Sequence, residues 1–162
     1  MSAPLVVQGV DETRLIALAE RLAPAVRAGG AIQLHGDLGA GKTTFARALL
    51  RALGVGERVK SPTYSLIESY RVGDLDIHHL DLYRIADPGE LEWLGLSDLA
   101  VASALLVVEW PERGVGVLPA ADLRLQLRHA GATRDLFADA GSPRGECLLA
   151  AWRAAVDTLQ SE

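Results

Sequence analysis

Residues 36–43, GDLGAGKT, match the phosphate-loop pattern G-x-x-x-x-G-K-[ST] at every fixed position. Glycines let the backbone curl, so that successive N–H groups point into one concavity and surround phosphate oxygens. The helix expected after the loop turns its positive N-terminal end toward the same anion. Lys42 is expected to reach the β- and γ-phosphates, and Thr43 to ligate Mg²⁺. The residues predicted to bind the nucleotide here are Gly36, Asp37, Leu38, Gly39, Ala40, Gly41, Lys42, Thr43 and Thr44.

The sequence around this loop predicts a strand before it and a helix after it, which is the context that the motif requires. Residues 31–35 are mostly apolar and are typical of a short strand. Apolar residues then recur at helical spacing as far as Leu53, and Gly54 follows where a helix C-terminal glycine is expected. This context favours a phosphate loop over an ordinary glycine-rich turn.

A second signal is a run of five apolar residues, 104–108, that ends in Glu109 and Trp110. A buried parallel strand of this kind can deliver a carboxylate to the Mg²⁺ side of a phosphate loop. Glu109 is therefore expected to be the acid on the Mg²⁺ side of the phosphate loop. We prefer this interpretation to that of a capping residue at the surface. Trp110 is expected to lie near the site. The strands that lead to Gly36 and to Trp110 should end on the same side of one sheet.

The segment between these two signals contains further polar candidates. Asp81 ends a predicted strand and could orient water or Mg²⁺ beside a nucleotide. Of the neighbouring histidines, only His79 shares a face with Asp81, which favours structural or supporting histidines over a metal site. Thr63 lies in the extended loop around Pro62, at a distance along the chain that suits a sensor of the γ-phosphate or its Mg²⁺. An ordinary loop entering a strand explains the Thr63 segment equally well.

The remaining patterns predict one α/β domain over residues 1–162, with the three-layer architecture of P-loop NTPases. Its sheet is expected to be largely parallel, with antiparallel additions from residues 64–82 and 122–138 and helices on both faces. Helices are predicted from Asp11 to Val26, from Asp87 onward, and from Cys147 to Leu159. Gly73-Asp74 is a hairpin signal between two of the strands.

The composition argues against a protein that binds nucleic acid unaided, spans a membrane or contains a disulfide. The net charge of −5 makes the chain a poor unaided binder of nucleic acid, whose affinity depends on neutralising phosphates. Apolar runs are too short to span a membrane, and residues 1–10 do not resemble a signal peptide. Cys147 is the only cysteine, which excludes an internal disulfide, suits the cytoplasm and is expected to pack in the core.

With these residues in view, the chain resembles the bacterial TsaE family, also called YjeE. The family comprises small P-loop ATPases needed for the threonylcarbamoyladenosine modification of tRNA. The resemblance rests on four motifs that cover most of the chain in order: HGDLGAGKTT at 35–44, KSPTY at 60–64, HLDLYR at 79–84 and EWPE at 109–112.

The resemblance implies an ATPase that joins the proteins TsaD and TsaB, resets their complex between turnovers and meets tRNA only through them. It also implies site roles. Thr43 and Glu109 would hold Mg²⁺, Asp81 would be essential to hydrolysis, and Trp110 would lie at the site. Lys42, Asp81 and Glu109 are accordingly the residues expected to carry the chemistry. An early acid and a late arginine would also approach the nucleotide, for which the candidates are Glu12 and Arg134.

Two other functions fit the phosphate loop less well. A small metabolite kinase usually has an arginine-rich lid late in the chain, whereas the late arginines here are not clustered in a lid-like loop. A regulatory GTPase needs Asp-x-x-Gly and [Asn/Thr]-Lys-x-Asp motifs, and neither occurs. No motif places an arginine where it would stabilise transition-state charge, so we expect slow hydrolysis until a partner protein binds.

Overall fold

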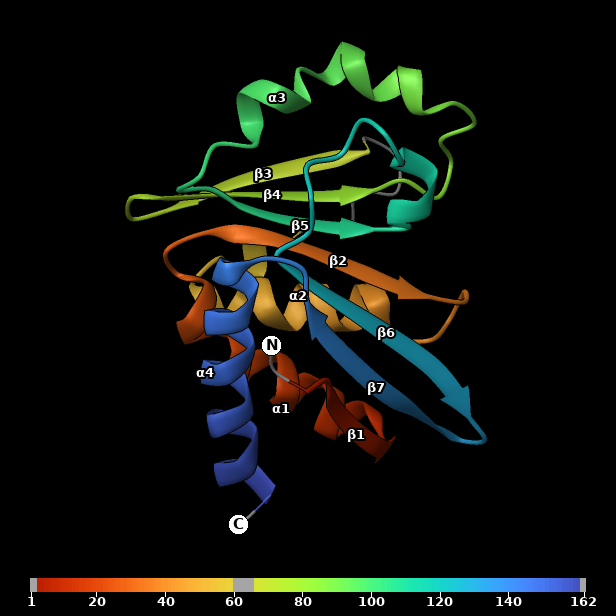
Figure 1. The fold of residues 1–162 in the computed structure, drawn as a ribbon, viewed down its shortest axis with the longest axis vertical. Coiled ribbons are helices and arrows are strands. Elements are labelled where there is room, and N and C mark those ends of the chain that lie inside the picture. Colours follow the sequence, from red (N-terminus) through yellow and green to blue (C-terminus); the bar gives the residue numbers. More distant parts are fainter. Residues whose placement is uncertain (1–2, 60–65, 161–162) are drawn as a thin grey trace.

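The computed structural model describes residues 3–59 and 66–160, in which the strands form a seven-stranded sheet (Figure 1). The strand order across the sheet is β1-β7-β6-β2-β5-β4-β3. The strands are β1 (Leu5–Val10), β2 (Gly30–Gly36), β3 (Ile67–Val72), β4 (Leu75–Asp81), β5 (Leu105–Glu109), β6 (Leu123–Ala130) and β7 (Thr133–Ala140). The predicted sensor Thr63 lies outside the described residues, together with the whole 60–64 motif.

The centre of the sheet is parallel and its flanks are antiparallel. Strands β6, β2, β5 and β4 pair in parallel, whereas β1–β7, β7–β6 and β4–β3 pair antiparallel. The predicted α/β class is confirmed, and β3 and β7 are antiparallel additions from the two predicted segments, whereas β4 and β6 of the same segments extend the parallel part. Because β1 also joins the sheet through β7, three of the six pairings are antiparallel. The strands that lead to the phosphate loop and to Trp110, β2 and β5, are parallel neighbours as predicted.

Residues that favour helix ends bound α1 at its start and α2 at its end. Helix α1 (Glu12–Leu22) starts after Asp11, whose carboxylate accepts a hydrogen bond from the Arg14 N–H at 2.8 Å. The chain then continues as a 3-10 helix, Ala23–Val26, so the predicted helix is α-helical only as far as Leu22. Helix α2 (Lys42–Leu53) ends at Gly54, which is left-handed with φ of 114°. Helix α4 is Pro143–Gln160.

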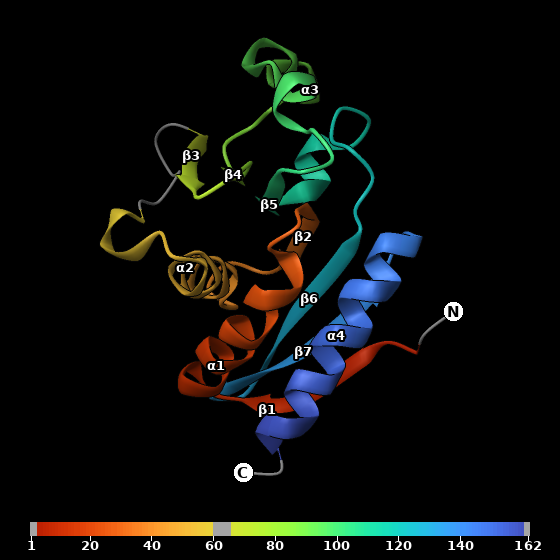
Figure 2. The ribbon, with the colours of Figure 1, turned by 90° about the vertical axis from the view of Figure 1, so that its left-hand side faces the viewer.

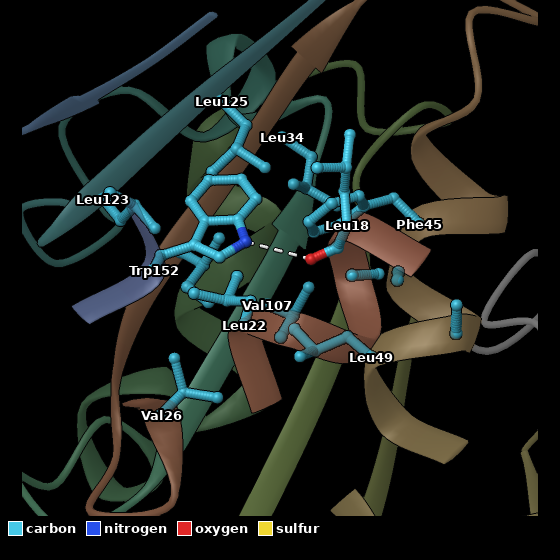
Figure 3. Packing of buried hydrophobic residues seen from close by; sticks show 14 of the residues in the cluster. Leu18, Leu22, Val26, Leu34, Phe45, Leu49, Val107, Leu123, Leu125 and Trp152 are labelled. Carbon is cyan, nitrogen blue, oxygen red and sulfur yellow. Dashed lines mark hydrogen bonds between the residues drawn. The ribbon is translucent and has the colours of Figure 1, made fainter. Parts of the chain in front are cut away.

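Helices α1, α2 and α4 cover one face of the sheet. In a view nearly along β4 and β5, α2 lies on one side of these two strands and α3 (Leu96–Leu99) lies on the other (Figure 2). Trp152 of α4 is fully buried in this core, where its indole N–H donates to the Leu18 carbonyl at 2.9 Å (Figure 3). Its ring also meets Phe45 of α2 edge to face, with centroids 6.0 Å apart. One side chain thus connects the first, second and last α-helices of this layer.

The opposite face is covered over β4 and β5 by a second apolar cluster. Leu91 of the 3-10 helix η3 (Pro88–Leu94) and Leu96 of α3 are buried there. The helix predicted from Asp87 onward is therefore mainly 3-10, although Asp87 does cap it by accepting from the Gly89 N–H at 3.0 Å. The prediction that Cys147 packs in the core is wrong, because Cys147 lies on the exposed side of α4. No helix in the described ranges is long and apolar enough to cross a membrane.

Candidate nucleotide-binding site

The carboxyl ends of three neighbouring parallel strands place the predicted polar residues at one edge of the sheet. Glu109 of β5 is the register partner of both Leu34 in β2 and Asp81 in β4. The phosphate loop therefore follows β2 beside the two acids. A cleft of about 380 Å³ opens here, and its lining residues are Leu38, Gly39, Gly41, Lys42, Thr43, Thr44, Asp81, Tyr83, Arg84, Glu109 and Trp110.

Two glycines of the loop are required by close packing. Gly36 has φ of 151°, and a Cβ atom there would lie 2.6 Å from the carbonyl oxygen of Leu127 in β6. Gly41 has φ of 115°, and a Cβ atom there would lie 2.7 Å from Leu15 of α1. A larger residue in place of Gly36 would have to displace the backbone of β6, and one in place of Gly41 would have to displace the core side chain of Leu15. The loop thus lies tightly between β6 and α1.

Lys42, the first residue of α2, is buried with its ammonium group directed at the loop. Its Nζ donates to the Gly36 carbonyl and, at 3.0 Å, to the Asp37 carbonyl. The same Nζ lies 3.9 Å from the centre of the Trp110 ring, a cation–π contact. Burial lowers the pKa of Lys42, an effect that the nearby Glu109 carboxylate opposes. Together these contacts fix the positive charge beside the backbone of the loop.

Thr43, Glu109 and His79 form a hydrogen-bonded chain across α2, β5 and β4. The Thr43 hydroxyl donates to Glu109 Oε1 at 2.6 Å, and His79 Nε2 lies 2.6 Å from Glu109 Oε2. Glu109 and His79 are almost completely buried. Each carboxylate oxygen therefore has one partner, which is what a buried carboxylate requires.

Asp81, the last residue of β4, is half-buried at the cleft. Its Oδ1 accepts the Tyr83 N–H at 3.1 Å, which fixes the carboxyl group in the turn that follows the strand. Burial raises the pKa of Asp81, the Tyr83 hydrogen bond opposes this, and the negative charge of Glu109 raises the pKa further. A carboxylate in such a setting is a better proton acceptor than one in water.

Trp110 connects the cleft to the protein surface. Its backbone is left-handed with φ of 58°, a conformation that is uncommon for a bulky residue and is concentrated at functional sites. Its ring lies 5.0 Å from that of Tyr83, and the Arg113 guanidinium lies 5.4 Å from the Tyr83 ring. A continuous row of contacts between rings and cations therefore runs from Lys42 through Trp110 and Tyr83 to Arg113.

The two weaker candidates lie beside the loop and do not line the main cleft. Glu12, the first residue of α1, is exposed and lines a second hollow of about 400 Å³ between α1 and α2, which also reaches Thr44. Arg134 of β7 lies behind the loop: a Cβ atom on Gly41 would be 3.8 Å from its Nε. Arg134 Nε and Nη1 are buried without a hydrogen-bond partner among the described residues. Arg134 therefore keeps donors for an anion near Gly41.

The oxygen donors at this edge suit Mg²⁺ held jointly with a phosphate. No group of three or more histidines, cysteines and acids in the described part of the chain could hold a metal by itself. Mg²⁺, however, usually takes one or two protein oxygens, with substrate phosphates and waters completing its shell. The Thr43 hydroxyl and the Glu109 carboxylate, 2.6 Å apart, are donors of this kind.

Three features of the site did not follow from the sequence. The hydrogen bond of His79 to Glu109 depends on the register of β4 against β5, which local patterns do not reveal. The contact between the Tyr83 and Trp110 rings depends on the turn after Asp81. Arg84 also lines the cleft. One indication of these roles is present in the sequence, namely that His79, Tyr83 and Arg84 all belong to the motif at residues 79–84.

The sequence matches a known family model over most of its length. Residues 10–136 match the model described as threonylcarbamoyl adenosine biosynthesis protein TsaE. This range includes every site candidate from Glu12 to Arg134. The four motifs quoted above also fall within it.

Individual relatives agree with the family model. A tRNA threonylcarbamoyladenosine biosynthesis protein TsaE from Haemophilus influenzae is 40% identical over 121 residues, covering 75% of this chain and 77% of the relative. The Bacillus subtilis protein of the same name is 37% identical, covering 75% and 74%. The crystal structure of Bacillus subtilis YdiB superposes with a TM-score of 0.78 at 28% identity, covering 95% of this chain and 97% of that one.

Proposed function

This chain belongs to the TsaE family of tRNA threonylcarbamoyladenosine biosynthesis, and from that premise we propose that it is a Mg²⁺-dependent ATPase. The observation that carries the proposal is the convergence of four side chains on one cleft. Lys42, Thr43, Asp81 and Glu109 all line it beside the phosphate loop. These are a cation, a hydroxyl and two carboxylates, the set that phosphoryl transfer to water requires.

Each side chain has a distinct part in the proposed reaction. Lys42 binds the outer phosphates with a charge-assisted contact, exchanging its loop carbonyls for phosphate oxygens. Thr43 and Glu109 hold Mg²⁺, which when bound supplies charge neutralisation on the phosphates. Asp81 orients the attacking water and accepts its proton, a role that its raised pKa favours.

Residues around the loop complete the proposed nucleotide contacts. Gly36 to Thr44 surround the phosphates with backbone N–H groups. Arg134 approaches from β7, where it has buried donors beside Gly41, and Glu12 approaches from the start of α1. The part of Thr63 as a phosphate sensor stays a prediction.

We propose that the ATPase acts on a complex of TsaB and TsaD in the cytoplasm, resetting it between turnovers. The family supports this assignment, and the net charge of −5 supports contact with tRNA only through those proteins. Nucleotide state would reach the surface through the contacts of Lys42 with Trp110 and of Trp110 with Tyr83, since Tyr83 is exposed.

Co-elution and phosphate release test this function. Purified protein should bind tRNA weakly and hydrolyse ATP slowly, and addition of TsaB and TsaD should give a nucleotide-dependent complex with faster turnover. A panel of nucleotides, assayed with and without candidate acceptors, tests the kinase alternative. Fast turnover that the partners do not change, or phosphate transfer to a metabolite, would contradict the proposal.

A further inference from the structure

We propose that His79 is a positioning residue for the metal site: its Nε2–H orients the Glu109 carboxylate so that, with Thr43, it can bind Mg²⁺. The inference rests on the proposed function, because it concerns the same Mg²⁺–nucleotide site. In this proposal His79 does not bind the metal or the nucleotide itself but holds the carboxylate that binds the metal.

The first support is the way the Glu109 carboxylate is held between two elements. Thr43 contacts Oε1 from the phosphate-loop helix, and His79 contacts Oε2 from β4, each at 2.6 Å. The histidine contact lies in the interior, where His79 is 0% and Glu109 1% exposed. A glutamate side chain has three rotatable bonds, so contacts to both oxygens restrict it far more than one contact would.

The second support is the hydrogen-bonding capacity of the imidazole. An ionised Glu109 can only accept hydrogen bonds, so the proton of the short contact must be on His79 Nε2. His79 Nδ1 is buried and has no partner among the described residues. A proton on Nδ1 would be a buried N–H without a partner in the described part of the chain, which is rare in proteins, so the hydrogen-bonding arrangement assigns the N–H to Nε2. This tautomer has one donor, and that donor is directed at Glu109.

The third support is the sheet register. In the parallel pairing of β4 with β5, Asp81 lies beside Glu109 and His79 lies beside Val107. His79 and Asp81 are two residues apart on one strand and face the same side. The Glu109 carboxylate therefore contacts His79 on the side of the buried strand β4 and Thr43 on the side of the phosphate loop. Residues that orient metal ligands in this way typically contribute about 10–100-fold to metal affinity.

His78 provides a matched control. It is the adjacent residue on β4, it is also buried, and its ring nitrogen Nδ1 lies 2.8 Å from the Ser69 hydroxyl of β3. A strand alternates its faces, so His78 is directed away from Glu109. Replacement of His78 disturbs the same strand without touching the proposed metal ligand.

The experiment measures how much Mg²⁺ strengthens binding of a non-hydrolysable ATP analogue to the full chain, by calorimetry in Mg²⁺ and in EDTA. For His79→Leu we expect the Mg²⁺-dependent gain to fall by about 10–100-fold, with the affinity in EDTA within about threefold of wild type. His79→Gln, whose amide can donate from near the Nε2 position, should retain most of the gain. His78→Leu should retain all of it. His79→Asn, whose amide ends one bond short, replaces His79→Leu if the latter does not fold.

Several results would overturn the assignment. It is wrong if His79→Leu keeps the full Mg²⁺-dependent gain, or if it loses affinity equally in EDTA, since that indicates a merely structural role. It is also wrong if the glutamine and leucine variants behave alike. A wild-type protein that shows no Mg²⁺-dependent gain would contradict the proposed function itself, which separates the two failures.

Discussion

Replacement of Asp81 by asparagine removes the charge and basicity of this side chain while leaving its shape. Asparagine retains an oxygen that can accept the Tyr83 N–H, the 3.1 Å contact that fixes the turn after β4. The cleft should therefore keep its form. Lys42, Thr43 and the loop glycines are unchanged in the variant, so the proposed phosphate contacts also remain.

The expected loss is in turnover and not in binding. A positioned acid or base typically contributes about 10²–10⁴-fold to a rate, so kcat of Asp81→Asn should fall by about that factor. Each tenfold step corresponds to about 1.4 kcal/mol of activation free energy. Nucleotide affinity should change by less than about threefold, because Asp81 is not proposed to hold the phosphates.

The same change should stabilise the fold at neutral pH. Burial and the charge of Glu109 raise the Asp81 pKa above its ordinary value of 3.8, so folding is less favourable with Asp81 ionised than with Asp81 protonated. This penalty is present above the folded pKa and disappears as pH falls toward the unfolded pKa. The Tm of Asp81→Asn, without nucleotide or Mg²⁺, should therefore exceed that of wild type at pH 7, and the difference should shrink toward pH 4.

Calorimetry, phosphate release and thermal unfolding are the three assays. Asp76→Asn is the control, because Asp76 lies on the same strand but forms a surface ion pair with Arg71 at 3.2 Å. It should leave turnover unchanged. Wild-type turnover in Asp81→Asn would refute the proposed role, and a lower Tm at pH 7 would refute the electrostatic reasoning.

Three other substitutions test separate parts of the account. Lys42→Ala should abolish productive ATP binding through loss of a charge-assisted phosphate contact, and calorimetry that found near-normal affinity would contradict this. Glu109→Ala should weaken binding or hydrolysis in Mg²⁺ but not binding in EDTA, so equal losses in both buffers would argue against a metal ligand. Trp152→Phe should lower the free energy of unfolding by about 1–3 kcal/mol in urea titrations, because the buried indole hydrogen bond to the Leu18 carbonyl is lost and the smaller ring leaves a void. Its nucleotide affinity should stay unchanged, and an unaltered urea midpoint would show that this hydrogen bond contributes little.

Much of the fold and the phosphate-binding apparatus could be predicted from the sequence, because local rules determine them. The glycines and Lys42 occur at fixed spacing, and Gly54 ends α2 as its position indicates. The apolar run before Glu109 is a fully buried strand, β5, beside β2. Strand and helix periodicity sufficed for these features.

The remaining features depend on contacts between distant segments. That His79 meets Glu109 requires the register of β4 against β5, and that Arg134 lies beside Gly41 requires β7 to pair with β6. Cys147 fits an apolar helical pattern, yet the helix turns this position to solvent while Leu148 and Trp152 face the core. The sequence predicts a helix from Asp87 onward without fixing its type, and residues 88–94 form a 3-10 helix. In each case tertiary packing determines what local patterns leave open.

The most direct test of the central claim is the rate of phosphate release from ATP, measured with wild-type protein and Lys42→Ala, with and without TsaB and TsaD. We predict slow Mg²⁺-dependent release by the wild type alone, faster release with both partners, and none above background from Lys42→Ala. Wild-type release that the partners leave unchanged, or that Lys42→Ala retains, would contradict the account.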